Sequence, residues 1–305
     1  MKPTRNVAFG YSTRCNIRCA HCVAADEVRD DRKMELDQAQ GILAEMAGAG
    51  VRGISFTAGE PLLYLDDVVD LLRRCRDYGI YTRIVTNSFW ARTEAEADRV
   101  VQLLQESGLC QLRLSYSRWH QQHVSRECVL NAARGCRKLG LDAFVSFVTD
   151  FSEQDDPYEQ FLRDRGLTFF PEPVIYAGRA GAFPRRGIFT DYQANCCPMN
   201  PYLSPDLEMY ACCDAGSHFA NTGFFRLGSL RDTTVGQLLE SSERNPLYHA
   251  IRTLGITGIA SFAGFKAREI VTYRKCELCR ELFDSPERLA MLQQAADSDL
   301  PGWTR

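Results

Sequence analysis

Short strand-like segments alternate with helical patterns from residue 5 to about residue 176. The strand-like segments are rich in β-branched or aromatic residues, and they span residues 7–11, 53–57, 80–86, 111–115, 143–149 and 167–170. Repeated strand–helix units favour a parallel sheet with right-handed crossovers. Six such repeats are fewer than the eight of a closed (β/α) barrel. The sequence therefore predicts an α/β fold whose N-terminal part is an open, partial (β/α)6 barrel.

Polar residues stand directly before several of the apolar helical faces and are expected to cap the helices that follow. Asp37 precedes an apolar face that begins at residue 39. Thr93 with Glu96 has the spacing of a capping box, in which each side chain satisfies a backbone N–H of the other residue. Ser125 precedes a further helical pattern.

Composition and charge exclude several classes of protein. Of the 305 residues, 45% are hydrophobic and 25% are charged, which is the ordinary globular mixture. A formal net charge of -3 gives no excess that favours nucleic acid or a membrane surface. Residues 1–10 lack the apolar stretch of a signal peptide, and no segment approaches the ~18 apolar residues of a membrane helix. We therefore expect a cytoplasmic protein with no nucleic-acid partner and no membrane partner.

The strand–helix pattern fades after residue 177. Residues 178–187 contain several glycines and a proline and are typical of a linker. The sequence thus predicts two domains, residues 1–177 and residues 178–305. One amphipathic stretch, residues 235–239, lies in the second domain, which we expect to be too irregular to hold itself by apolar burial alone. A bound metal would supply the missing stabilisation.

The chain contains 13 cysteines, an odd number. Disulfides are rare in the reducing cytosol, so clustered cysteines there indicate metal binding or catalysis. Cys15, Cys19 and Cys22 have C-x3-C-x2-C spacing directly after the first strand. Three thiolates around a four-iron cluster leave one iron without a protein ligand, where a small molecule can bind. The alternative is a zinc site, for which His21 is the nearby fourth ligand.

The triplet resembles the signature of the radical S-adenosylmethionine (SAM) superfamily. Thr57-Ala58-Gly59-Glu60-Pro61 is similar to the Gly-Gly-Glu motif of that family, and Thr86-Asn87-Ser88 is similar to its Thr-Asn-Gly segment. The resemblance covers about residues 7–176. It implies that Cys15, Cys19 and Cys22 hold a 4Fe-4S cluster to which SAM binds. It also implies cofactor-binding roles for His21 near the adenine, Gly59 and Glu60 at the amino group, Ser115 and Ser117 at the ribose and Arg179 at the carboxylate, and a cofactor-binding role for Asn87 in the Thr-Asn-Gly-like segment.

A second set of cysteines lies late in the chain. Cys197, Cys212, Cys276 and Cys279 together offer four soft ligands, enough for a second cluster or a zinc ion. Their surroundings resemble the auxiliary-cluster regions of SPASM and twitch radical SAM enzymes. The resemblance favours the smaller twitch version, a small irregular iron–sulfur domain with one auxiliary 4Fe-4S cluster. Cys196 and Cys213 would then stand beside that cluster, either as hydrogen donors to a substrate radical or as small buried apolar residues.

Other candidates are weaker. Cys75 and Cys136 lie on apolar helix faces and are expected in the core. Cys128 lies in the first turn of a helix, where the helix dipole lowers a thiol pKa. Residues 118–123, with Arg118 and His120, follow the fourth strand and either contact substrate or SAM or form a surface loop.

The family resemblance implies a function. Radical SAM enzymes cleave SAM reductively to a 5′-deoxyadenosyl radical that abstracts a substrate hydrogen, and they need an electron donor such as flavodoxin or ferredoxin. Relatives of this build imply modification of a ribosomally synthesised peptide by epimerisation, crosslinking or oxidation in natural-product biosynthesis. Two alternatives remain open. One is a twitch-type epimerase or dehydrogenase of a sugar or aminocyclitol, and the other is a non-catalytic metal-cluster module that binds a partner.

Overall fold

A computed structural model describes residues 5–23, 31–184, 199–213, 223–266, 269 and 275–297. Six parallel strands form the N-terminal part of one sheet. They are β1 (Arg5–Gly10), β2 (Val51–Thr57), β3 (Tyr81–Thr86), β4 (Gln111–Tyr116), β5 (Asp142–Thr149) and β6 (Phe169–Pro173). The predicted strands and their parallel order are confirmed.

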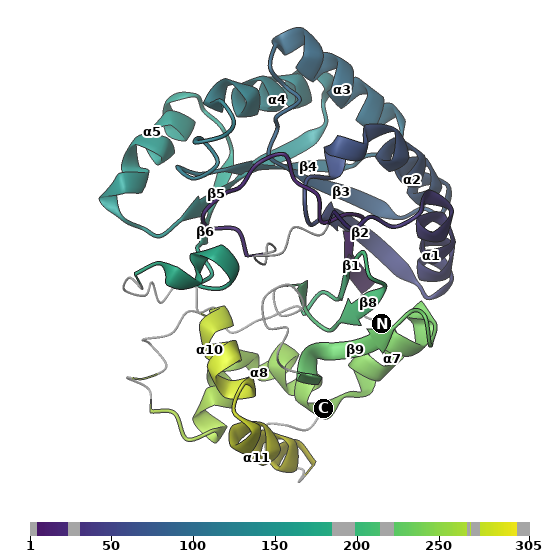
Figure 1. Ribbon diagram of the computed structural model, residues 1–305, viewed down its shortest axis with the longest axis vertical. Helices are drawn as coiled ribbons and strands as arrows, with labels where there is room; N and C mark the ends of the chain where they lie inside the picture. The colour runs from purple at the N-terminus through teal and green to yellow at the C-terminus, as the bar shows by residue number, and fades with distance from the viewer. Residues whose placement is uncertain are drawn as a thin grey trace.

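Helices cover the outer side of these strands (Figure 1). They are α1 (Leu36–Gly48), α2 (Leu65–Asp77), α3 (Glu94–Glu106), α4 (Arg126–Leu139) and α5 (Asp156–Asp164), with short 3-10 helices η1 (Pro61–Tyr64) and η2 (Glu153–Asp155) before α2 and α5. The result is the open, partial barrel that the sequence predicts.

Alternation along the strands separates a helix-covered face from the interior of the barrel. In β4, Leu112, Leu114 and Tyr116 are buried against the helices, whereas the residues between them are only partly buried. Two of those alternate residues, Arg113 and Ser115, line a cavity inside the barrel. A closed (β/α)8 barrel fills this space with packed apolar side chains. This interior is polar and open instead.

Two of the predicted helix caps are confirmed and one is wrong. Thr93 and Glu96 form the complete capping box of α3, and the Ser125 hydroxyl accepts the Glu127 N–H at the start of α4. Helix α1 begins one residue before Asp37, so Asp37 lies in its first turn and makes no cap. An acidic side chain there still interacts favourably with the positive end of the helix dipole.

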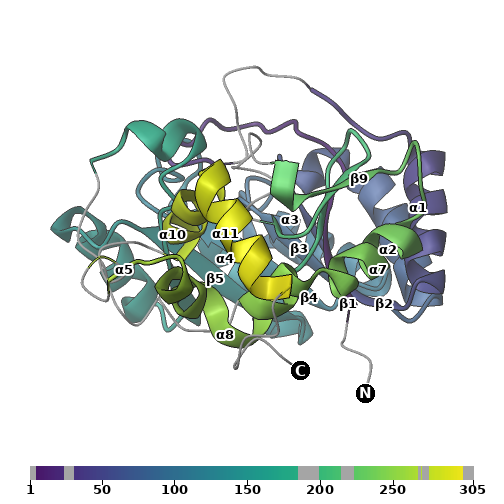
Figure 2. The same cartoon turned by 90° about the horizontal axis from the view of Figure 1, so that it is seen from below.

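The same sheet continues beyond residue 177. Strand β7 (Tyr202–Leu203) pairs in parallel with β1, and β8 (Glu208–Tyr210) and β9 (Arg226–Ser229) add antiparallel strands, with η5 (Gly223–Phe225) before β9. Helix α7 (Val235–Arg244) lies beside α1 in both ribbon views (Figures 1 and 2). The Val235 N–H donates to Glu45 on α1 at 3.2 Å. Apolar side chains of β7, β8 and α7, such as Leu203, Met209 and Leu238, therefore belong to the core of the barrel.

The C-terminal part is more regular than the sequence predicts and contains an apolar cluster of its own. Helices α8 (Pro246–Phe262), α10 (Lys275–Phe283) and α11 (Pro286–Asp297) enclose a second apolar cluster. Its members recur at helical spacing, as in Leu247 and Ile251 on α8 or Leu278 and Leu282 on α10, a periodicity that the sequence analysis did not recognise. None of the described helices is long and apolar enough to cross a membrane.

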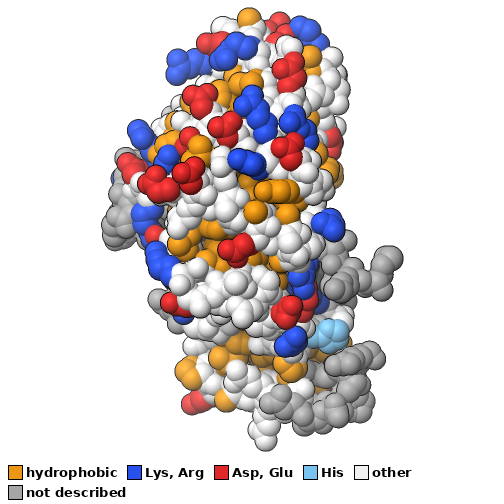
Figure 3. All heavy atoms as spheres, turned by 90° about the vertical axis from the view of Figure 1, so that its right-hand side faces the viewer, with side chains coloured by type: hydrophobic (Ala, Val, Ile, Leu, Met, Phe, Trp, Pro, Cys, Tyr) orange, Lys and Arg blue, Asp and Glu red, His pale blue; other side chains and the backbone are white. Residues whose placement is uncertain are grey.

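The segment predicted as a linker is structured at its start. Residues Gly178–Ala182 form the 3-10 helix η3, and the Arg179 N–H donates to the Cys22 carbonyl at 3.2 Å. Elsewhere on the surface, acidic and basic side chains are interspersed across the face shown in Figure 3. That distribution agrees with the small net charge.

Candidate active site

The three cysteines of the triplet lie in the loop after β1 and line one cavity at the carboxyl ends of the strands. The cavity has a volume of about 750 Å³ and continues down into the barrel interior. This size lies within the range of sites for small molecules and cofactors. Cys19 is buried, and Cys15 and Cys22 are partly buried.

The surroundings of the thiols disfavour free reactive cysteines. Burial raises the pKa of Cys15 to about 11 and the pKa of Cys19 to about 12. A bound metal deprotonates a coordinating thiol outright, so these thiols suit metal ligation better than nucleophilic attack. Among the described residues, the possible metal ligands whose ligand atoms all lie within 4.8 Å of one another are those of Cys19, His21 and His120. Cys15 and Cys22 do not belong to this group. The three thiols of the triplet are therefore too widely spaced to share one ion, and the loop fits a multi-iron cluster better.

The segment after β2 is pressed against the cysteine loop. Gly59 has φ +58°, and a Cβ on it would lie 2.3 Å from the Arg14 carbonyl oxygen. The next backbone N–H, that of Glu60, donates to the same carbonyl at 2.7 Å. Ala58 also has a positive φ of 66°, which costs a non-glycine residue about 1 kcal/mol. Only glycine fits at position 59, and the contact fixes the loop against the sheet.

Glu60 joins the ends of two strands and is 1% exposed. One carboxylate oxygen accepts the Leu62 N–H at 3.1 Å and the Thr86 hydroxyl at 2.9 Å. The other accepts the Asn87 N–H at 2.7 Å. Burial raises the pKa of Glu60 to about 7, and these hydrogen bonds oppose that shift. The Asn87 side chain in turn donates to Asn16 in the cysteine loop at 2.9 Å.

Two histidines, His21 and His120, line the cavity beside Cys19, and Trp119 packs against His21. The His21 ring lies 5.0 Å from the Trp119 ring and 4.7 Å from the His120 ring, between centroids. Burial lowers the pKa of His21 well below its ordinary value and lowers the pKa of His120 to about 4, so both rings are neutral. The His21 Nδ1 atom is buried and has no hydrogen-bond partner within the described chain. A polar atom of this kind suits a site that a ligand completes.

Ser117 fixes the tautomer of His120. The Ser117 hydroxyl accepts the His120 backbone N–H at 3.2 Å and lies 2.8 Å from His120 Nδ1. Ser117 is fully buried, so its own proton is satisfied when it is donated to Nδ1. The imidazole proton then resides on Nε2. Ser117 is not among the residues that line the cavity, whereas Ser115 and His120 are.

Arg179 supports the cysteine loop from the other side. Its Nε donates to the Cys19 carbonyl at 2.8 Å, and the side chain lines the cavity. Apolar residues surround Cys19 and keep water from this corner; they are Trp119, Val174, Tyr176 and Ala180. The cysteine loop is thus held by β2, β3 and η3 together.

The late cysteines fall into two environments. Cys212, Cys276 and Cys279 pack against the second apolar cluster, and the last two lie three residues apart on α10. Cys213 instead lines the barrel cavity. Cys196 and Cys197 lie outside the described residues.

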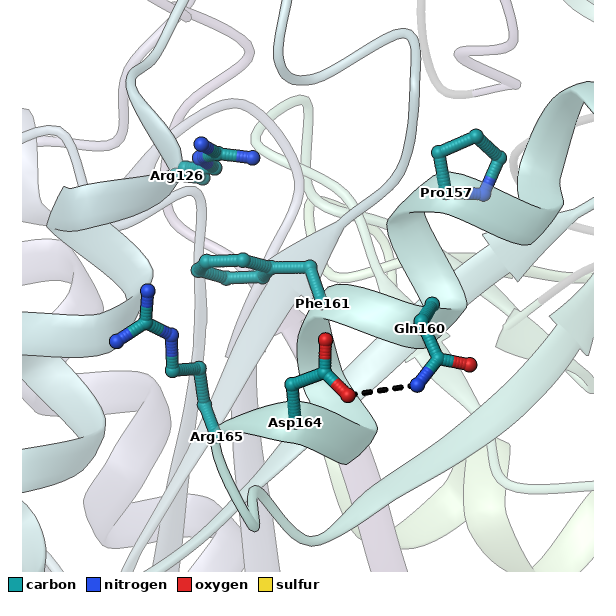
Figure 4. Close-up of a pocket in the computed structure, with 6 residues that line it drawn as sticks. All are labelled: Arg126, Pro157, Gln160, Phe161, Asp164 and Arg165. Carbon is teal, nitrogen blue, oxygen red and sulfur yellow. Dashed lines mark hydrogen bonds between the residues drawn. The ribbon is translucent and has the colours of Figure 1, made fainter.

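Several other candidates prove structural. Cys75 and Cys136 are buried in the core, as predicted. The lowered pKa suggested for Cys128 is wrong, because burial raises its pKa. Arg118 forms ion pairs with Asp150 at 2.8 Å and with Asp155 at 2.6 Å and so braces the loop after β5. A separate hollow between α4 and α5 lies on the outer surface, where Phe161 stands between Arg126 and Arg165 (Figure 4).

Comparison with known proteins identifies the family. The family model of the radical SAM superfamily matches residues 10–164. This chain belongs to the radical SAM superfamily. A PqqA peptide cyclase of Methylobacterium nodulans is 36% identical over 105 residues, which are 34% of this chain and 26% of that protein. A GTP 3′,8-cyclase of Chlorobaculum tepidum is 32% identical over 110 residues, 36% of this chain and 32% of that protein.

The matches to these curated relatives span about a quarter to a third of their length. A solved structure shares the fold over nearly the whole chain. Native anSMEcpe with bound AdoMet and Cp18Cys peptide matches with a TM-score of 0.62 and 14% identity, over 97% of this chain and 99% of that one. Radical SAM enzymes use a 4Fe-4S cluster and SAM, and the loop of Cys15, Cys19 and Cys22 fits the cluster.

The polar residues of the barrel interior were not predicted from the sequence. Arg83, Arg113 and Glu172 line the cavity from β3, β4 and β6. A signal was present, because each occupies the face of its strand opposite the helices. Charged side chains on that face predict a polar interior.

Replacing Gly59 by Ala tests the contact between β2 and the cysteine loop. We expect Gly59→Ala to displace the loop and to lose the iron of one cluster, because its Cβ would overlap the Arg14 carbonyl. The measurement is iron and sulfide per chain after anaerobic reconstitution. Gly79→Ala is the matched control, since Gly79 also has a positive φ, +67°, but nothing within 4 Å of its Cβ position. Equal iron in both variants would contradict the account.

Glu60 should make folding stability depend on pH. Its folded-state pKa of about 7 lies above its value in the unfolded chain, so the folded state holds the proton more tightly. The resulting stabilisation is complete at low pH and is lost as the pH rises through the folded-state value. We expect the free energy of unfolding of wild type, relative to Glu60→Gln, to fall by about 2 kcal/mol between pH 5 and pH 8. Urea titrations of the apoproteins measure this difference, and a constant difference across that range would refute it.

Proposed function

We propose that this radical SAM enzyme modifies a peptide in the cavity at the carboxyl ends of its strands. The main support for this proposal is that the cysteine triplet, Glu60 and Cys213 line one cavity, which continues into a polar barrel interior. The name of the PqqA peptide cyclase and the Cp18Cys peptide bound to anSMEcpe support a peptide substrate.

We assign the residues of the cavity to the two cofactors. Cys15, Cys19 and Cys22 would hold a 4Fe-4S cluster. Gly59, Glu60 and Asn87 would meet the amino group of SAM, where a buried carboxylate can pair with an ammonium.

The other parts of SAM would meet different residues of the cavity. Ser115 would contact the ribose, His21 the adenine and Arg179 the carboxylate. Ser117 would act indirectly, because it sets the tautomer of His120. The cluster and SAM supply a 5′-deoxyadenosyl radical that abstracts a substrate hydrogen.

The protein itself positions and protects this chemistry. The apolar wall around Cys19, with Trp119 and Tyr176, excludes water from the reacting centre. The hydrogen bonds of Glu60 keep β2 and β3 in register with the cysteine loop. Fixed geometry of this kind raises the effective concentration of the reacting groups.

We further propose an auxiliary 4Fe-4S cluster in the C-terminal part. Cys212, Cys276 and Cys279 border one apolar cluster and would provide three of its ligands, with Cys197 as the fourth. Such a cluster would accept an electron from a substrate radical or pass one to it. Residues 178–305 would then form a twitch-like unit that shares part of the barrel sheet.

The central test is SAM cleavage by anaerobically reconstituted protein. Wild type should form 5′-deoxyadenosine from SAM with dithionite and should bind about eight irons per chain, the content of two such clusters. Cys15→Ala should abolish 5′-deoxyadenosine and remove about half of the iron. Cys276→Ala should remove the other half and leave cleavage in place. Zinc without iron, or iron without any 5′-deoxyadenosine, would instead favour a non-catalytic metal module.

The position of Cys213 favours epimerisation as the reaction type. Its thiol lines the same cavity as the triplet. It could return a hydrogen atom to the substrate radical on the face opposite abstraction, and one electron from the electron donor and one proton from water would then restore the thiol. In deuterated water the exchanged thiol would place one deuterium in the product, measured by mass spectrometry. Cys213→Ala should lose that label and accumulate an oxidised product, whereas an unchanged label would exclude this role.

A further inference from the structure

The barrel interior below the proposed SAM site carries two arginines on neighbouring strands. Arg83 lies on β3 and Arg113 on β4, and both side chains line the cavity. In the register of the two strands, Arg113 pairs with Val85, two residues beyond Arg83. Arg113 is also two residues before Ser115, about 7 Å lower in the barrel at the rise of a strand. Arg113 therefore lies one step below the residue assigned to the SAM ribose, and Arg83 lies a further two residues down the barrel.

In each guanidinium group, one of the three nitrogens bonds to the described part of the chain. The Arg83 Nε donates to the Gln111 side chain at 2.5 Å, and the Arg83 guanidinium carbon lies 5.7 Å from the centre of the Phe144 ring. One Arg113 nitrogen donates to Ser146 at 3.1 Å and forms an ion pair with Glu172. The Arg113 Nε is buried and has no hydrogen-bond partner in the described chain. Within that same part of the chain, no acceptor for the other two Arg83 nitrogens is observed.

The two guanidinium groups are not equally neutralised. Arg113 forms an ion pair with Glu172, whereas Arg83 reaches a carboxylate, that of Asp142, only through the Gln111 side chain, which accepts from Arg83 and donates to Asp142. A buried donor without a partner costs free energy that an incoming oxygen atom would recover. Guanidinium groups present planar forks of N–H donors that match a carboxylate.

The cavity walls also favour a carboxylate over a polyphosphate as the ligand. Phosphate sites usually recruit backbone N–H groups at helix N-termini or in turns. Here the walls are β3 and β4, whose backbone N–H groups belong to the sheet ladder. Side chains are therefore the main donors, and the planar N–H forks of two guanidinium groups suit a carboxylate.

We propose that Arg83 and Arg113 form a subsite that binds a carboxylate of the substrate, such as an Asp or Glu side chain of a peptide. This inference rests on the proposed function, because it places the substrate below SAM in the same cavity. Glu172 competes for Arg113 and sets the strength of binding.

The test uses two probes that differ only in charge. These are the tripeptides acetyl-Gly-Glu-Gly-amide and acetyl-Gly-Gln-Gly-amide, titrated against cluster-loaded protein with SAM and followed by saturation-transfer NMR. Wild type should bind the Glu peptide about tenfold more tightly than the Gln peptide, in line with a charge-assisted pair. Arg83→Gln should remove most of this preference, and Glu172→Gln should strengthen it because Arg113 loses its internal partner.

Controls separate this proposal from others. Arg134→Gln, on the outside of α4 and paired with Glu94, should behave as wild type. The double variant Arg113→Gln with Glu172→Gln avoids an unpaired buried charge and should also lose the preference. GTP serves as the phosphate source in a parallel titration. Equal binding of both peptides, no effect of Arg83→Gln, or stronger Arg83-dependent binding of GTP would overturn the proposal.

Cleavage of SAM without substrate is measured on the same samples. Wild type without 5′-deoxyadenosine would count against the proposed function, whereas the peptide preference alone decides the carboxylate subsite. Variants that cleave SAM as wild type does but keep the preference for the Glu peptide would reject the subsite and leave the enzyme assignment in place.

Discussion

The hydrogen bond from the Glu60 backbone N–H to the Arg14 carbonyl connects the sheet to the cysteine loop. The loop has little regular structure of its own, so its cysteines depend on the sheet for their positions. The close approach requires glycine at position 59, and the Glu60 carboxylate continues the connection to β3. The parallel sheet thus fixes the geometry of the loop that carries the three cysteines. Sites built on such supports hold reacting groups more precisely than isolated loops do.

The open barrel follows from the same arrangement. Six strands do not close around an apolar filling, and the interior keeps side chains such as Arg113 and Ser115 partly exposed. The buried core lies instead between the strands and the outer helices. The face of each strand that packs against the helices therefore stabilises the fold, and the opposite face lines the candidate site. This separation permits charged groups inside the barrel without a large cost to the core.

The six strands, the partial barrel and the cysteine triplet could be predicted because each depends on a pattern of residues that are close in the sequence. Alternating β-branched residues mark the strands, and the capping box at Thr93 marks the start of α3. The second apolar cluster was not predicted, because the helical spacing of residues such as Leu247 and Ile251 was not recognised in this cysteine-containing region. The pairing of the buried Ser117 hydroxyl with His120 was not predicted either. Such pairings depend on how loops from different strands meet, which local patterns do not encode. The separation of Cys212 from Cys213, one at the second cluster and one in the cavity, has the same origin.

The most direct measurement is an electron paramagnetic resonance spectrum of the dithionite-reduced Cys276→Ala variant, recorded anaerobically before and after SAM is added. In this variant the proposed auxiliary site is disabled, so the signal reports the cluster at Cys15, Cys19 and Cys22. We predict a reduced 4Fe-4S signal whose shape changes when SAM binds to the iron without a protein ligand. A spectrum that SAM leaves unchanged, or a sample that holds zinc in place of iron, would contradict the account.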